Sequence, residues 1–175
     1  MALRRNIEVK IPVADLDRLR DAAIALGATS VGIEEQTDRY YELVGGRRVK
    51  LRTRASGAAE LIRYDRPETG GVRASDYEVT PVRDQETRLC LVPSEPAVAI
   101  VHKRREVLLL ENVRIHLDDV ERLGAFLELE AVVDREHDDG ACHRQVAALL
   151  DALGLAAAEP IRASYGELIR DAPHS

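Results

Sequence analysis

The sequence predicts an α+β protein: an antiparallel sheet of seven or eight strands, closed into a barrel, with helices packed outside it. Many short segments alternate charged and aliphatic residues, and this period of two is typical of strands with one polar face. Gly, Pro, Asn and Ser recur between these segments and indicate turns. Helical periodicity follows the first strand and returns near the C-terminus.

Composition favours a single globular domain over residues 1–175. A chain of this length buries about two-thirds of its unfolded surface. With one Phe, five Tyr and no Trp, the core must be built from aliphatic side chains. The net charge of −6 argues against a nucleic-acid binder, although 25 Lys and Arg residues could still converge on a small anionic ligand.

Hydropathy and cysteine content both indicate where the protein is located. No apolar run approaches the roughly 20 residues of a membrane span, and the N-terminal MALRRN lacks the apolar core of a secretory signal. Cys90 and Cys142 have no CxxC spacing and are interpreted as free thiols. We therefore expect a soluble cytoplasmic protein with no membrane contact.

The N-terminal half begins with a strand over residues 5–11. A helix is predicted from Asp15, since Leu residues recur at helical spacing until Gly27. Residues 30–43 form one or two strands, and Gly45-Gly46 predicts a tight hairpin into a further charged strand.

The second half opens with a hairpin at Ser56–Ala58 and a predicted mobile loop at Pro67–Gly71. Residues 87–92 fit a strand, but Asp84 is also a fair helix start, so a helix from Asp84 to Leu91 is the alternative. Helices are expected over 138–155 and 164–171. The remaining strands are predicted at 60–66, 75–82, 97–110, 112–117 and 126–133.

Charged residues share one face of the predicted strands. A wet outer sheet face explains this for any single strand, but nearly every polar position across five strands is charged. A barrel of eight strands encloses a lumen wide enough for a small ligand, and charged walls select a charged one. The residues are Asn6, Glu8, Lys10, Lys50, Arg52, Arg54, Lys103, Arg105, Arg114, His116, Asp118, Glu128 and Glu130.

The two signs of charge suggest two chemical roles. Arg and Lys side chains bind phosphate oxygens, and carboxylates bind hard divalent cations. Together they describe a site for a metal and a polyphosphate. The GxxxxGK[ST], GxGxxG and HExxH motifs are absent, and His116 is the one histidine on the charged face.

Nearly the whole chain carries short motifs in a recognisable order. Asn6–Lys10 stands where an ExExK signature is expected, and further matches follow, including Arg114–Glu130, which reads RIHLDDVERLGAFLELE. On these motifs the chain resembles the CYTH superfamily of triphosphate tunnel metalloenzymes, most closely its class IV adenylyl cyclase-like branch, as one CYTH domain. The other matches are Gln36–Tyr41, Leu51–Arg54, Leu61–Pro67, Ser75–Tyr77, Lys103–Arg105 and Ser164–Ile169.

The resemblance implies roles for particular residues. Glu8, Glu128 and Glu130 would bind Mg²⁺ or Mn²⁺, with Asp118 as a ligand or as a carboxylate just behind the ligands. Glu8, Lys10 and Asp118 are the implied catalytic residues. The implied phosphate-binding residues are Lys10, Arg52, Arg54, Arg63, Lys103, Arg105 and Arg114.

The resemblance also implies an activity and a partner. The expected function is conversion of ATP to 3′,5′-cyclic AMP and pyrophosphate. Hydrolysis of the terminal phosphate of a nucleoside, thiamine or inorganic triphosphate is the first alternative, and phosphate-ligand binding without chemistry is the second. The family suggests a homodimer. Asn6 departs from the pattern, because it offers a neutral oxygen where ExExK has its first carboxylate.

Overall fold

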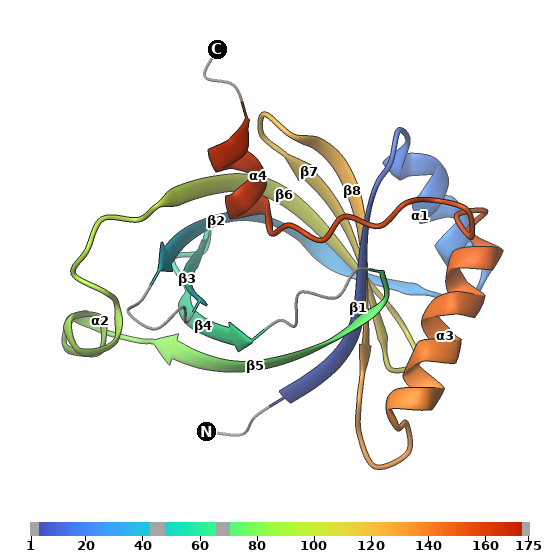
Figure 1. Ribbon diagram of the computed structural model, residues 1–175, viewed down its shortest axis with the longest axis horizontal. Helices are drawn as coiled ribbons and strands as arrows, with labels where there is room; N and C mark the ends of the chain where they lie inside the picture. The colour runs from blue at the N-terminus through green and yellow to red at the C-terminus, as the bar shows by residue number, and fades with distance from the viewer. Residues whose placement is uncertain (1–3, 43–47, 66–70, 173–175) are drawn as a thin grey trace.

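The computed structural model describes residues 4–42, 48–65 and 71–172. This part of the chain contains eight strands and four helices, whose arrangement is shown in Figure 1. They are β1 (Arg4–Pro12), α1 (Leu16–Ala25), β2 (Thr29–Glu42), β3 (Arg48–Arg54), β4 (Ala59–Asp65), β5 (Arg73–Val82), α2 (Gln85–Leu91), β6 (Ala99–Leu110), β7 (Val113–Val120), β8 (Gly124–Val132), α3 (Asp139–Ala152) and α4 (Tyr165–Asp171).

The eight strands form one closed barrel in the order β1-β5-β4-β3-β2-β6-β7-β8. Every neighbouring pair is antiparallel, and β1 closes the ring by pairing with both β5 and β8. Closure leaves no sheet edge and separates an inner from an outer face. The predicted α+β barrel is therefore confirmed.

The largest core lies outside the barrel. Figure 1 shows α1 and α3 together on one flank and α2 on the opposite flank. Leu19 and Ala23 of α1 and Val146 of α3 pack on the outward aliphatic side chains of β1, β7 and β8, such as Ile7 and Leu129. The apolar residues of each strand thus turn outward to the helices, which directs the charged residues inward.

Helix α4 closes one end of the barrel. Tyr165 packs with Phe126, their ring centroids 5.1 Å apart, and with Tyr40. Gly166 faces the ring of Tyr40, where an added Cβ would lie 2.6 Å from Cγ. Only glycine allows this approach, so α4 lies tightly against the barrel end.

Two sequence alternatives are resolved by local contacts. Residues 85–91 form a helix and not a strand, because the side chain of Asp84 caps it by accepting from the backbone N–H of Thr87 at 2.7 Å. Residues 29–42 form one strand, with a register shift between Ser30 and Gly32.

The remaining sequence predictions concern turns and membrane contact. The Ser56–Ala58 turn is confirmed by the bond from the N–H of Gly57 to Arg54. Gly45-Gly46 and Pro67–Gly70 lie outside the described residues. None of the helices in the described part of the chain has the length and hydrophobicity of a membrane span.

Candidate functional site

The barrel encloses a cavity of about 530 Å³ that opens at the end away from α4. Inward side chains of all eight strands line it, and about half of them are charged. This volume falls within the range of about 300–1,000 Å³ that is usual for small-molecule sites. A smaller inner hollow, lined by Lys10, Lys50, Lys103 and Tyr165, lies at the closed end.

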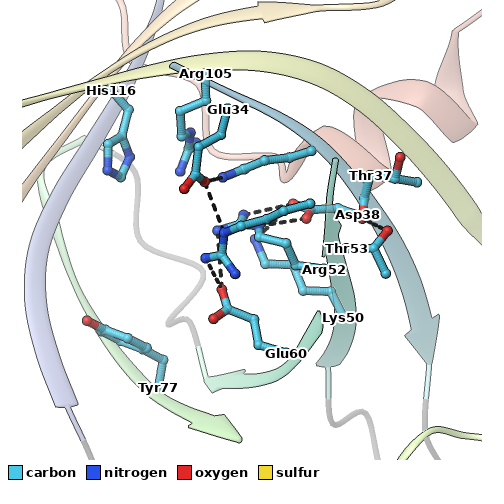
Figure 2. A network of polar contacts seen from close by, with 12 residues as sticks. Glu34, Thr37, Asp38, Lys50, Arg52, Thr53, Glu60, Tyr77, Arg105 and His116 are labelled. Carbon is cyan, nitrogen blue, oxygen red and sulfur yellow. Dashed lines mark hydrogen bonds and ion pairs between the residues drawn. The ribbon is translucent and has the colours of Figure 1, made fainter. Parts of the chain in front are cut away.

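One side of the lumen, which we call the basic wall, consists of Asp38 on β2 with Lys50, Arg52 and Arg54 on β3. Arg52 donates to both oxygens of Asp38, at 2.8 and 2.9 Å, and the Nζ of Lys50 lies 3.3 Å from the same carboxylate (Figure 2). The cross-strand pairing of Asp38 with Arg52 produces this contact. The wall is thus rigid before any ligand arrives.

Charge balance decides the protonation of Asp38. Its side chain is fully buried, and burial alone would raise its pKa. The positive charges of Arg52, Lys50 and Lys103 outweigh burial and hold the pKa of Asp38 well below its usual value. Asp38 is therefore a carboxylate at neutral pH.

Arg54 lies further toward the open end and is held between two carboxylates. It donates to Glu34 at 3.0 Å and to Glu60 at 2.9 Å. Gln36, the neighbour of Glu34 on the inner face of β2, donates to the same Glu34 oxygen at 2.8 Å. These contacts fix the guanidinium in the lumen.

Lys103 lies at the closed end among groups of both signs. Its Nζ is 3.6 Å from Asp38 and 3.7 Å from Asp118, and it lies 5.0 Å from the centroid of the Tyr165 ring. Burial, and next the charge of Arg105, lower the pKa of Lys103 to about 7, because the two carboxylates compensate only in part. Lys103 is therefore only partly protonated near neutral pH.

Both carboxylate oxygens of Asp118 form hydrogen bonds with other side chains of the protein. Both of its oxygens accept from Arg105, at 2.6 and 2.5 Å, and the hydroxyl of Tyr165 donates to it at 2.8 Å. Asp118 does not line the main cavity, whereas Arg105 does and also donates to Glu128 at 2.6 Å. Asp118 thus holds Arg105 in place, behind Glu128.

The opposite side of the lumen, which we call the acidic wall, consists of His116 on β7 with Glu128 and Glu130 on β8. The Nδ1 of His116 lies 3.8 Å from Glu128 and 3.7 Å from Glu130, and one potential ligand atom from each residue falls within 4.8 Å of the others. His116 is 6% exposed, and its buried Nδ1 has no hydrogen-bond partner. These donors fit a divalent cation.

The charges around the acidic wall favour its metal-binding protonation states. Burial, and next the charge of Arg105, lower the pKa of His116, which leaves its imidazole neutral at pH 7. Burial would raise the pKa of Glu128, but the positive charges of Arg105 and Lys10 outweigh it and hold that pKa well below its usual value. A neutral imidazole and ionised carboxylates are the forms that bind metals.

Asn6 supports the acidic wall by hydrogen bonds. Its Nδ2 donates to Glu130 at 3.2 Å, and its Oδ1 accepts from Arg114 at 3.3 Å and from the Tyr77 hydroxyl at 3.5 Å. Arg114 also lies 3.1 Å from Glu130. A carboxylate at position 6 has no N–H with which to donate to Glu130, so the asparagine has a contact that a glutamate would lack.

Glu8 lines the cavity, where it pairs across strands with Glu130 and contacts Arg73 at 3.4 Å. Lys10 lies deeper: it lines the inner hollow, donates to the carbonyl of Ala163 at 3.1 Å and lies 4.0 Å from the centroid of the Tyr165 ring. The two residues of the ExExK-like strand thus lie at different depths in the lumen.

Arg63 is a correction to the sequence prediction. It pairs with Val49, which packs outward, whereas Ile62 pairs with Lys50 and lines the cavity. On β4 the inward positions are therefore Glu60, Ile62 and Tyr64. Arg63 lies on the outer face and is not placed to bind a ligand in the lumen.

Lys50 was placed on the charged face by its parity with Arg52, and it lines the cavity. Three other residues of the site were not predicted from the sequence. Asp38 contacts Arg52 on the next strand, whereas Arg73 and Tyr165 are buried at the lumen through contacts with residues distant in the sequence.

Comparison with known proteins adds a family and relatives. The CYTH domain model matches residues 4–165. A protein of Methanocaldococcus jannaschii, provisionally named an adenylate cyclase, is 24% identical in an alignment of 170 residues that covers 93% of this chain and 97% of that protein.

Solved structures share the fold. A Pyrococcus horikoshii protein is similar with a TM-score of 0.80 and 27% identity, covering 94% of this chain and 99% of its own. A Vibrio parahaemolyticus protein, also provisionally named an adenylate cyclase, is similar with a TM-score of 0.70 and 16% identity, covering 93% and 96%.

Proposed function

This chain belongs to the CYTH domain family of triphosphate tunnel enzymes, and we propose that it is a divalent-metal-dependent adenylyl cyclase that converts ATP to 3′,5′-cyclic AMP and pyrophosphate. One observation supports this most: a single enclosed cavity has the basic wall on one side and the acidic wall on the other. A triphosphate chain needs the first, and its metal ion needs the second. The provisional name of the Methanocaldococcus relative agrees.

Arginine side chains hold the phosphates in this proposal. Arg52, Arg54, Arg105 and Arg114 line the main cavity, while Lys10 and Lys103 line the inner hollow. The guanidinium fork matches two phosphate oxygens at once. Because carboxylates already hold Arg52, Arg54 and Arg105 in place, little side-chain entropy is lost when a ligand binds.

The acidic wall, together with Glu8, would hold Mg²⁺ or Mn²⁺. A bound divalent cation supplies Lewis-acid polarisation of the phosphoryl oxygens. Of the three residues predicted to be catalytic, Glu8 lines the main cavity, whereas Lys10 lies in the inner hollow and Asp118 behind Arg105. We therefore assign to Glu8 acceptance of the proton from the ribose 3′-hydroxyl, and to the arginines stabilisation of the departing pyrophosphate.

Apolar side chains favour a substrate with an organic group. Ile62 and Val79 are cross-strand neighbours that both line the cavity, and Val107 lines it from β6. Inorganic triphosphate gains nothing from such surface, whereas a nucleobase buries apolar area against it. These residues support a nucleoside triphosphate as the substrate.

Hydrolysis of the terminal phosphate is the second candidate, and the inner hollow favours it. Lys10, Lys50 and Lys103 line this hollow beside Glu128. A terminal phosphate drawn toward these ammonium groups would lie next to the acidic wall, where attack by water releases inorganic phosphate. In hydrolysis the same residues would act on the terminal phosphorus atom, and not on the phosphorus atom that is attacked in cyclisation.

A product assay separates the candidates. The purified protein is incubated with ATP and Mn²⁺, and nucleotides and phosphates are resolved by chromatography, with GTP, thiamine triphosphate and inorganic triphosphate in parallel. Cyclic AMP with pyrophosphate is the expected result. ADP with phosphate would overturn the cyclase in favour of the triphosphatase, and tight binding without products would indicate a binding protein. Glu130→Gln is the control, with turnover expected to fall by more than about 100-fold.

A further inference from the structure

His116 is the side chain that stands out within the acidic wall. Its imidazole points into the lumen apart from the hydrogen-bonded network of the basic wall (Figure 2). In the described part of the chain, four buried side-chain polar atoms lack a hydrogen-bond partner, and the Nδ1 of His116 is the one that faces two carboxylates. A buried nitrogen left without a partner carries a desolvation cost that a ligand would remove.

The distances suit a shared ion. Two ligands about 2.1 Å from one ion lie about 3.0 Å apart when adjacent and about 4.2 Å apart when opposite in an octahedral shell. The distances of 3.8 and 3.7 Å from Nδ1 to Glu128 and Glu130 fall between these values. They exceed hydrogen-bond length, so the gap is too wide for a direct bond and of the right size for a cation.

Neighbouring residues orient Glu130 toward this gap. The contacts of Asn6 and Arg114 with Glu130 both involve its Oε2, whereas its Oε1 faces His116. Glu128 is held differently, because its Oε2 both accepts from Arg105 and is the oxygen nearest to His116. The support of ligating carboxylates by hydrogen bonds from behind is a usual feature of metal centres.

We propose that His116 is a metal ligand with Glu128 and Glu130, and that the site consequently binds Mn²⁺ in preference to Mg²⁺. This inference deepens the proposed function, on which it rests for the identity of the site. Mg²⁺ strongly prefers oxygen ligands, whereas imidazole nitrogen suits transition-metal ions. Asn6 then contributes by orienting Glu130, which accounts for an amide where ExExK has a carboxylate.

Direct metal binding tests the inference without turnover. Mn²⁺ alone is titrated into the nucleotide-free protein by calorimetry and by electron paramagnetic resonance, and Mg²⁺ in competition. We expect Mn²⁺ to bind at least about 10-fold more tightly than Mg²⁺. His116→Ala should weaken Mn²⁺ binding by about 10-fold or more and reduce the preference over Mg²⁺. His102→Ala, at an exposed histidine on β6, is the matched control and should change neither affinity.

A spectroscopic readout distinguishes ligation from a structural role. Electron spin echo modulation of bound Mn²⁺ should show a coordinated imidazole nitrogen in the wild type, and its frequencies should shift when histidine is labelled with ¹⁵N. The signal should be absent in His116→Ala and in His116→Asp, which restores an all-oxygen site and raises relative Mg²⁺ affinity. Bound Mn²⁺ without nitrogen modulation would overturn the inference and leave the proposed function intact. Failure of the wild type to bind Mn²⁺, even with ATP, would overturn both.

Discussion

The two walls of the lumen differ in how their charges are compensated. In the basic wall, Asp38 accepts two hydrogen bonds from Arg52, and Arg54 is held between Glu34 and Glu60. In the acidic wall, the Nδ1 of His116 stays beyond hydrogen-bond distance of both carboxylates. The basic wall is therefore compensated by its own carboxylates, since buried cations are costly without partners. In the proposed function, an ion would complete the acidic wall.

Removing the charge of Asp38 should have the largest effect, and it tests whether the basic wall depends on its internal ion pairs. Asp38→Asn keeps the shape of the side chain but leaves three buried cations near one another, so we expect the free energy of unfolding to fall by about 3–5 kcal/mol. Thermal unfolding measures this loss. Inorganic triphosphate should restore part of it, because the ligand supplies the missing negative charge.

The control for Asp38 is an exposed ion pair. Glu42→Gln removes a carboxylate that contacts Arg170 at 2.7 Å but is 62% exposed, and the midpoint of unfolding should not change measurably. Equal losses in the two variants would mean that the basic wall is not organised around Asp38.

A smaller effect is expected when Arg54, one of the cations proposed to bind phosphate, is removed. Arg54→Ala should weaken binding of inorganic triphosphate by about 10- to 100-fold, the value of one or two charge-assisted hydrogen bonds, and weaken monophosphate binding less. Calorimetric titration measures both. Arg63→Ala, on the outer face of the neighbouring strand, is the matched control and should leave both affinities unchanged. Equal loss for mono- and triphosphate would place Arg54 outside the triphosphate site.

The smallest expected effect is the pH dependence that comes from Lys103. Its pKa of about 7 means that it loses its charge as the pH rises through neutrality, and a bound anion favours the protonated form. Triphosphate binding should therefore take up a proton and weaken a few-fold between about pH 6 and about pH 8.

Lys103→Arg provides the reference for that profile, because arginine stays charged throughout this range. The protonation of the ligand itself changes with pH in the same way for both proteins. The difference between the two pH profiles therefore measures the protonation of Lys103. Superimposable profiles would show that Lys103 does not change its protonation on binding.

Much of the site could be predicted from the sequence because strand parity is a local property. Alternation along 5–11 and 126–133 placed Glu8 and Glu128 on inner faces, and the same rule placed Arg52 and Arg105. The family resemblance, and not alternation, implied Arg63, and that prediction was wrong, since β4 has only Glu60 as a charged inward residue and its outer face also carries charge. The phase of an alternation is fixed by the neighbouring strands.

The sequence by itself determined the barrel class, the helix caps and which residues of most strands face together, because these depend on periodicity over a few residues. Only the tertiary structure decided the partners. The register of consecutive strands brings Asp38 to Arg52 and His116 to the two glutamates, and the docking of α4 brings Tyr165 to Asp118 from a distant part of the chain. The unpaired nitrogen of His116 depends on side-chain positions in the folded barrel, and no local pattern in the sequence encodes it.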